Sequence, residues 1–185
     1  MHRTPEDFGE QKKWAIPLMA SKEGQTAPPG EISLRPASPA DSEFLLLAYA
    51  STRQDEMASW GWNSVQQASF VQMQFDARRR GYAAEYPSAQ ISLICVGESL
   101  AGSIIISRSQ SEIRLVDITL LPEFRSRGIG GRLIGTLTSE AARSGSAVRL
   151  NVLRGNRARH LYERLGFVAK GSDPMYCEME WTAAS

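Results

Sequence analysis

The stretch from residue 113 to residue 145 constrains the fold more than any other part of the chain, because its hydrophobic period changes midway. Ile113–Leu121 carries apolar residues on both faces, as expected of a central strand. Pro122 stops this strand, since proline cannot donate to a sheet ladder. After Gly128 the apolar residues follow a helical stripe until Gly145, at Ile129, Leu133, Leu137 and Ala141. One core must therefore hold both a sheet and a helix.

The first thirty residues differ in composition from the rest of the chain. Gly, Pro, Lys, Glu and Gln dominate residues 1–30, and Ala27-Pro28-Pro29-Gly30 closes the stretch. We interpret residues 1–30 as a flexible N-terminal tail. The folded domain is expected to occupy residues 31–185.

Turn signals and periodicity divide this domain into strands and helices. Ser38-Pro39-Ala40-Asp41 predicts a helix start, with a capping serine and a proline at the first helical position. A second helix is expected from Asn63-Ser64 until Gly81 and Pro87 end it. Further segments are expected as strands at 32–36, 91–96, 100–107, 148–152, 167 onward and 175–181, and as a helix at 158–165 closed by Gly166. The order β-α-α-β-β-β-α-β-α-β-β predicts a mixed α/β sheet.

Composition and charge exclude several classes of protein. The formal net charge is +1, so the chain as a whole has no strong positive field that would attract nucleic acid. Cys95 and Cys177 lie in apolar runs and are expected to be buried reduced thiols. His2 and His160 are the only histidines, so no metal site is predicted. No stretch reaches the roughly 20 apolar residues of a membrane span, and the N-terminus lacks a secretory signal, so a cytoplasmic location is expected.

The loop between the central strand and its helix has the chemistry of an anion site. The segment Arg125-Ser-Arg-Gly-Ile-Gly-Gly131 leads into a helix N-terminus, where backbone N–H groups are unpaired and the helix dipole is positive. A pyrophosphate fits such a site. The dinucleotide fingerprint is excluded because Leu133 stands where its third glycine belongs, and the triphosphate loop is excluded because Arg132 follows Gly131.

Two motifs together resemble a known family. Arg125-x-x-Gly128-x-Gly130 is similar to the Q/R-x-x-G-x-G/A signature of the GNAT superfamily of N-acetyltransferases. Asn156, Ala158 and Leu161-Tyr-Glu-Arg-Leu-Gly-Phe167 resemble the family's N-x-x-A-x-x-L-Y-x-x-x-G-F segment, with one residue fewer between Asn156 and Ala158. The resemblance covers roughly residues 31–182. It implies a mostly antiparallel sheet of six to seven strands, flanked by about four helices, whose central strands splay apart.

The resemblance also implies a cofactor and the residues that hold it. Acetyl-CoA is the expected acyl donor, with its pyrophosphate on the loop and its pantetheine arm in the gap beside the strand that carries Ile118–Leu120. A Leu120 amide would stabilise the oxyanion. The cofactor-binding residues implied are Ile118, Thr119, Leu120, Arg125, Ser126, Arg127, Gly128, Ile129, Gly130, Gly131, Asn156 and Tyr162. Tyr162 matches the tyrosine that protonates the departing thiolate, although it could also be a packed helix tyrosine.

The acceptor side is less constrained. Asp117, an acid in an apolar strand, is the first candidate for the base that takes the amine proton, and burial would raise its pKa toward a useful value. The alternative is an ion pair between Asp117 and Arg114 or Arg149. Glu56 is the second candidate. Trp60 and Trp62 could form an aromatic wall for the acceptor or could simply pack against the fold.

The expected reaction is acetyl transfer from acetyl-CoA to a primary amine of an unidentified acceptor. The alternative is a non-catalytic acyl-CoA-binding regulatory or assembly module, because the cofactor motif is the same in both. The predicted partners are acetyl-CoA and the amine acceptor, with neither nucleic acid nor membrane. A homodimer is common among proteins that resemble this one, and the sequence leaves the oligomeric state open.

Overall fold

The computed structural model describes residues 30–183. The predicted flexible tail falls almost entirely on residues 1–29, which lie outside the described residues. No helix within the described range is long and apolar enough to cross a membrane.

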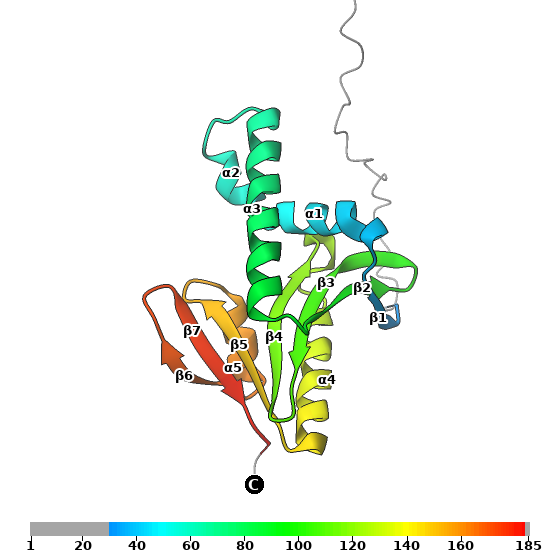
Figure 1. Cartoon of the computed structure of the whole chain (residues 1–185), viewed down its shortest axis with the longest axis vertical. Helices are drawn as coiled ribbons and strands as arrows, with labels where there is room; N and C mark the ends of the chain where they lie inside the picture. The colour runs from blue at the N-terminus through cyan, green and yellow to red at the C-terminus, as the bar shows by residue number, and fades with distance from the viewer. Residues whose placement is uncertain (1–29, 184–185) are drawn as a thin grey trace, which may run out of the picture.

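Seven strands form one sheet in the order β1-β2-β3-β4-β5-β7-β6 (Figure 1). Only β4 and β5 pair in parallel, and every other neighbouring pair is antiparallel. The strands are β1 (Ile32–Pro36), β2 (Gln90–Val96), β3 (Ser99–Arg108), β4 (Glu112–Leu120), β5 (Ala147–Leu153), β6 (Val168–Ser172) and β7 (Tyr176–Trp181). This confirms the predicted mixed, mostly antiparallel α/β sheet.

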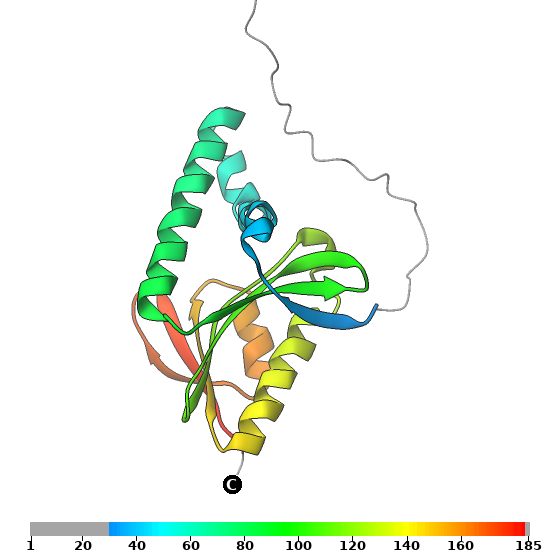
Figure 2. The ribbon, with the colours of Figure 1, turned by 45° about the vertical axis from the view of Figure 1, so that its right-hand side comes forward.

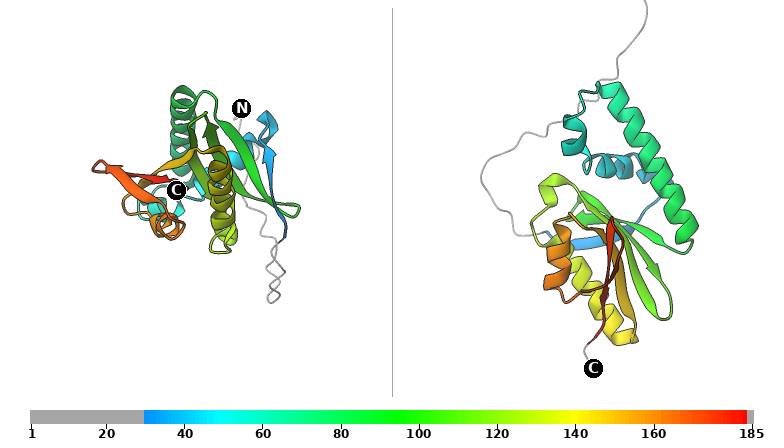
Figure 3. Two further views of the ribbon diagram at one scale, coloured as in Figure 1. Left: turned by 90° about the horizontal axis from the view of Figure 1, so that it is seen from below. Right: turned by 90° about the vertical axis from the view of Figure 1, so that its left-hand side faces the viewer.

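Five α-helices and two short 3-10 turns complete the described part of the chain. The helices are α1 (Ser42–Ala50), α2 (Gln54–Ala58), α3 (Ser64–Glu85), α4 (Ile129–Ser144) and α5 (Ala158–Arg164), and the 3-10 turns are Pro39–Asp41 and Pro122–Phe124. Figures 2 and 3 show α4 and α5 against one face of the sheet, with α1 and α3 on the other side. The short helix α2 was not predicted.

Capping residues set the ends of the helices where the sequence predicted them. Asn63 caps α3, since its Oδ1 accepts from the Gln66 amide at 3.0 Å and the Gln66 side chain accepts from the Asn63 amide at 3.0 Å. Gly145 ends α4 in the left-handed conformation, with φ of 68°. The prediction that Gly81 helps to end α3 is wrong, because the helix passes through Gly81 to Glu85.

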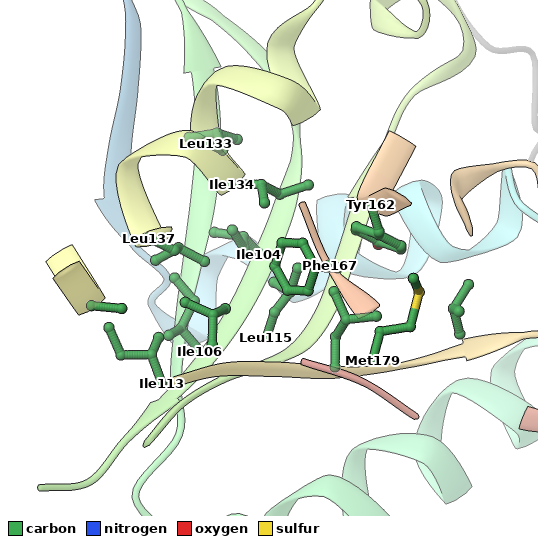
Figure 4. Packing of buried hydrophobic residues seen from close by; sticks show 14 of the residues in the cluster. Ile104, Ile106, Ile113, Leu115, Leu133, Ile134, Leu137, Tyr162, Phe167 and Met179 are labelled. Atoms are coloured by element: carbon green, nitrogen blue, oxygen red, sulfur yellow. The ribbon is translucent and has the colours of Figure 1, made fainter. Parts of the chain in front are cut away.

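Two hydrophobic clusters hold these layers together. The larger lies between the sheet and helices α4 and α5, where Ile104, Ile134, Leu150 and Met179 are fully buried (Figure 4). The smaller joins α1, α2 and α3 through Tyr49, Met57, Val71 and Phe75. Cys177 is buried and Cys95 only half-buried, and both thiols are free.

The two parallel strands β4 and β5 separate after a short paired stretch. Their pairing runs from Glu112↔Ala147 to Leu115↔Leu150, and beyond Leu115 the strands diverge (Figure 1). The Leu121 amide donates to the Ala101 carbonyl at 2.9 Å, so alternate amides of β4 face β3. The amides of Ile118 and Leu120 therefore face the gap, as the splayed central strands of the prediction require.

A bulge in β4 changes which face of the sheet its residues occupy. Ile105 pairs with Asp117 while Ile106 pairs with Leu115, so Val116 is an extra residue. Leu115 and Ile118 both belong to the α4 side of the sheet. Asp117 is thereby turned toward α1 and α3, although strict alternation would place it on the same face as Leu115.

Gly102 allows β3 and β4 to approach closely beside the gap. A Cβ on Gly102 would lie 2.0 Å from the Thr119 carbonyl oxygen. Gly102→Ala is expected to lower the free energy of unfolding by about 3 kcal/mol, because neither backbone can yield without breaking the ladder. Gly81→Ala is the control, since its new methyl meets nothing within 4 Å and alanine favours the helix by about 0.5–1 kcal/mol. Urea unfolding followed by circular dichroism measures both, and equal stability of the two variants would contradict the close approach.

Candidate functional site

The chain enters α4 through a loop that concentrates unpaired backbone amides. Ser126 and Gly128 both adopt the left-handed conformation, with φ of 59° and 77°. The Arg132 amide makes the first bond of the helix, to the Gly128 carbonyl at 3.0 Å. The amides of Ile129, Gly130 and Gly131 precede it, so they have no partner within the helix and lie at its positive end. This geometry suits an anion.

Open space around the glycines of the loop keeps this helix end accessible. A Cβ on Gly128 would meet no atom within 4 Å, while a Cβ on Gly130 would lie 3.7 Å from Leu161 of α5. Leu161 of α5 thus lies beside the first turn of α4 at Gly130, with room for an ordinary contact. Sequence reasoning missed the left-handed Ser126, which is the one non-glycine residue with positive φ among residues 30–183.

The two arginines of the loop have different surroundings. Arg125 Nε donates to the Leu120 carbonyl at 2.8 Å, and its NH2 lies 3.3 Å from the Ser51 carbonyl oxygen. Arg125 therefore ties the end of β4 to the end of α1. The Arg127 guanidinium lies 5.7 Å from the Phe124 ring centroid and is exposed. A direct cofactor contact of Arg125 or Arg127 stays a prediction.

The second predicted motif lies on α5 and its entrance. Asn156 Oδ1 accepts from the amide of Ala158, the first residue of α5, at 2.9 Å, while a contact of Asn156 with a cofactor stays a prediction. Tyr162 is 6% exposed and packs against Phe167, with 5.8 Å between ring centroids (Figure 4). Burial, and then the charge of Asp117, raise the pKa of Tyr162 to about 12. The phenol therefore stays protonated at neutral pH.

A cavity of about 300 Å³ lies on the opposite face of the sheet, between α1, α3 and the strands β2, β3 and β4. Its walls are mostly apolar or aromatic. Asp117 and Arg78 line it together with Ser103 and Thr119, which are both buried. A concave, largely apolar pocket with a few convergent polar groups is typical of a site for a small molecule.

Asp117 pairs with a residue that the sequence did not indicate. Its Oδ1 accepts from Arg78 on α3, and its Oδ2 accepts from Thr119 Oγ1 at 3.2 Å. Arg114 and Arg149, the predicted partners, instead pair with Glu112 at 2.8 and 2.9 Å. The bulge at Val116 turns Asp117 toward α3, where Arg78 lies, whereas Arg114 and Arg149 pair with Glu112 at the start of β4.

Burial and the charge of Arg78 have opposite effects on the pKa of Asp117. Burial raises the pKa of Asp117 above its ordinary value, although the charge of Arg78 and the hydrogen bond from Thr119 lower it. Arg78 is itself held by Tyr49 and Tyr82, whose ring centroids each lie 5.2 Å from its guanidinium carbon. Its Nε also donates to the Tyr82 hydroxyl at 3.0 Å. The arginine that pairs with the candidate base is thus fixed by two aromatic rings.

The other predicted acceptor residues lie outside this cavity. Glu56 is exposed on α2 and pairs with Arg53 at 2.9 Å. Trp60 and Trp62 form an edge-to-face cluster with Phe70, with centroid distances of 4.8 to 5.3 Å. None of Glu56, Trp60 and Trp62 lines the cavity. Their part in acceptor binding stays a prediction, and the structure shows Trp60 and Trp62 packing against Phe70 of α3.

Residues 87–169 match a family model described as an acetyltransferase (GNAT) domain. The matched segment runs from the end of α3 into β6, so it contains the gap, Asp117, the glycine loop and Tyr162. The segment that holds the split sheet and the start of α4 is therefore similar to a GNAT acetyltransferase domain.

Solved structures share this fold. The PaiA N-acetyltransferase from Thermoplasma acidophilum, in complex with coenzyme A, has a TM-score of 0.62 at 19% identity, covering 83% of this chain and 99% of that chain. Ard1 from Thermoplasma volcanium has a TM-score of 0.54 at 22% identity, covering 83% and 99%. An acetyltransferase from Thermus thermophilus has a TM-score of 0.59 at 14% identity, covering 82% and 97%. Comparison with curated protein sequences finds no match.

The ion pair at the cavity gives a test of the site. Arg78→Met is expected to lower the free energy of unfolding by about 2 kcal/mol near pH 8, because it leaves the Asp117 carboxylate in the protein without its cation. The loss of Arg78 raises the pKa of Asp117 further, so the deficit should shrink as pH falls through that pKa and the carboxyl becomes neutral.

Denaturant unfolding between about pH 5 and pH 8 measures this deficit. Arg80→Met is the control, because Arg80 is an exposed neighbour on α3 that does not line the cavity. A deficit of Arg78→Met that does not change with pH would contradict a pair with Asp117.

Proposed function

We propose that this acetyltransferase moves the acetyl group of acetyl-CoA to a primary amine by direct attack of the amine. The observation that carries the proposal is the gap between β4 and β5. The N-terminus of α4 follows β4 after one loop, Asp117 lies on β4 beyond its paired stretch with β5, and Tyr162 lies on α5, which follows β5. This arrangement supports a single opening that serves a binding edge, a carboxylate and a phenol.

The residues around the gap fit acetyl-CoA. The amides of Ile129, Gly130 and Gly131 offer donors for a pyrophosphate, and Gly128 leaves room for its approach. The inward-facing amides of Ile118 and Leu120 offer a strand edge to the two amide groups of a pantetheine arm. When bound there, acetyl-CoA would supply a thioester whose carbonyl carbon is open to nucleophilic attack.

Asp117 is the proposed base. The amine forms its bond to carbon only as a neutral group, so its ammonium form must first give up a proton, and Asp117 lines the cavity where this can happen. Its raised pKa strengthens it as a proton acceptor. Glu56 is a weaker candidate, because it is exposed, is paired with Arg53 and lies outside the cavity.

Tyr162 is the proposed acid. As the C–S bond breaks, the Tyr162 hydroxyl would give its proton to the sulfur, and solvent would then return a proton to the phenolate. A thiol of pKa about 8.5 leaves readily, so the phenol assists the step without being indispensable to it. The Leu120 amide would stabilise negative charge on the carbonyl oxygen during attack.

The alternative function, a non-catalytic acyl-CoA-binding module, needs the same loop and gap. It gives no reason for an aspartate with a raised pKa in a cavity beside them, and this residue favours the enzyme. Steady release of free CoA when amines are supplied separates the two functions, because a binding module consumes no thioester.

Gly130→Glu tests cofactor binding. The added carboxylate would occupy the anion site, so we expect acetyl-CoA to bind at least about 100-fold more weakly. Gly130→Ala is the matched control for folding, since its methyl meets only Leu161 at 3.7 Å, an ordinary contact. Calorimetric titration and thermal shift, with NAD as a negative control, measure binding. If the unchanged chain binds no CoA species, the proposed function is wrong.

Tyr162→Phe tests the acid. We expect kcat to fall by about 10- to 100-fold while the affinity for acetyl-CoA stays within about twofold, because only proton donation to sulfur is lost. Tyr176→Phe is the control, since Tyr176 is an exposed tyrosine on β7. An unchanged kcat for Tyr162→Phe would remove this residue from the mechanism.

A further inference from the structure

The charged residues that line the cavity do not balance. They are Arg78, Arg79 and Asp117, so two cations face one carboxylate. Arg78 is paired with Asp117. Arg79 has no carboxylate within salt-bridge distance among residues 30–183, and its guanidinium carbon lies 5.6 Å from the Phe75 ring centroid. The cavity therefore carries one uncompensated positive charge, on an arginine that is exposed to solvent at its edge.

Nearby ion pairs do not compensate this charge. Arg35 pairs with Asp41 at 2.8 Å, and Arg53 pairs with Glu56 at 2.9 Å. Each pair is neutral as a whole, and none of the four residues lines the cavity. The excess positive charge thus belongs to the cavity itself and acts on whatever enters it.

This charge discriminates between two kinds of amine. A simple alkylamine enters as an ammonium ion, which would be a third cation facing one carboxylate in partly desolvated surroundings. An amino acid enters as a zwitterion: its ammonium can face Asp117 while its carboxylate faces an arginine, and the net charge does not rise. Guanidinium groups bind carboxylates in this way with charge-assisted hydrogen bonds.

The size and lining of the cavity limit the rest of the acceptor. A volume of about 300 Å³ is at the lower end for small-molecule sites. Leu45, Phe75, Ile91 and Ile105 give it apolar walls. An aliphatic or aromatic side chain would gain burial there. A lysine side chain of a protein would bring an apolar stem but no carboxylate.

We propose, on the basis of the proposed function, that the acceptor is a small amino acid with an apolar side chain, and that Arg79 selects it by binding its carboxylate. The new bond joins the amino nitrogen to the acetyl carbon, and the C–S bond breaks. Asp117 takes one ammonium proton before attack and passes it to solvent, then takes the second proton from the nitrogen of the tetrahedral intermediate. Tyr162 protonates the departing sulfur and regains its proton from solvent. The products are an N-acetyl amino acid and free CoA.

Matched substrate pairs test this proposal. L-leucine is compared with 3-methylbutylamine and L-phenylalanine with phenethylamine, because each amine is its amino acid without the carboxylate. Free CoA release gives kcat/KM, which is corrected for the neutral fraction of each amine. We expect the amino acid to be favoured at least about tenfold in each pair, as a charge-assisted hydrogen bond requires.

Substitutions at Arg79 locate the selectivity. Arg79→Gln should reduce the preference to about twofold or less, Arg79→Lys should retain most of it, and Arg80→Gln, outside the cavity on the same helix, should leave it unchanged. A preference for the simple amines, or no turnover of either pair by a chain that binds acetyl-CoA, overturns the acceptor class. An unchanged preference in Arg79→Gln overturns the role of Arg79. Failure to bind acetyl-CoA at all would instead contradict the proposed function.

Discussion

The separation of β4 and β5 after Leu115 is the constraint on which the rest of the structure depends. Each strand keeps a full antiparallel ladder on its outer side, β4 with β3 and β5 with β7, so the separation gives up only the inner hydrogen bonds. The amides of Ile118 and Leu120 are left facing the gap, where the Ile118 amide donates to the Asp117 carboxylate and the Leu120 amide can bind a ligand or water. The sheet thereby gains a binding edge at its centre rather than at its periphery.

Two local irregularities give the gap its chemistry. The bulge at Val116 sends Asp117 to the α3 side while Ile118 returns to the α4 core, so one short stretch serves both faces. Gly102 lets β3 approach β4 at the same level, which holds the edge of the gap in place. Because α4 starts only a few residues after β4, the anion-binding helix end is fixed relative to the same strand. The proposed cofactor edge and the cavity are thus both positioned by β4.

The sequence was sufficient for features that are local in the chain. The order of strands and helices, the stripe of α4 and the glycine loop follow from spacing, and the structure contains them. The sequence did not predict the features that depend on tertiary packing. The helix α3 passes through Gly81 because packing on one side outweighs the roughly 1 kcal/mol that a glycine costs there. The five-residue α2 is too short to show a period. The partner of Asp117 lies 39 residues away on α3, and only the bulge, which has no clear sequence signal, brings the two together.

Burial raises the pKa of both Asp117 and Tyr162. The proposed reaction uses one raised pKa for a proton acceptor and the other for a proton donor. A higher pKa makes the carboxylate a better proton acceptor and keeps the phenol a proton donor at neutral pH. Burial without a counter-charge would go too far at Asp117, because the carboxyl would hold its own proton and could accept none. Arg78 limits the shift, and its place between the rings of Tyr49 and Tyr82 lets it remain charged and partly buried. In the proposed mechanism the cavity needs its arginine as much as its aspartate, because Asp117 would be the base and Arg78 opposes the rise in its pKa.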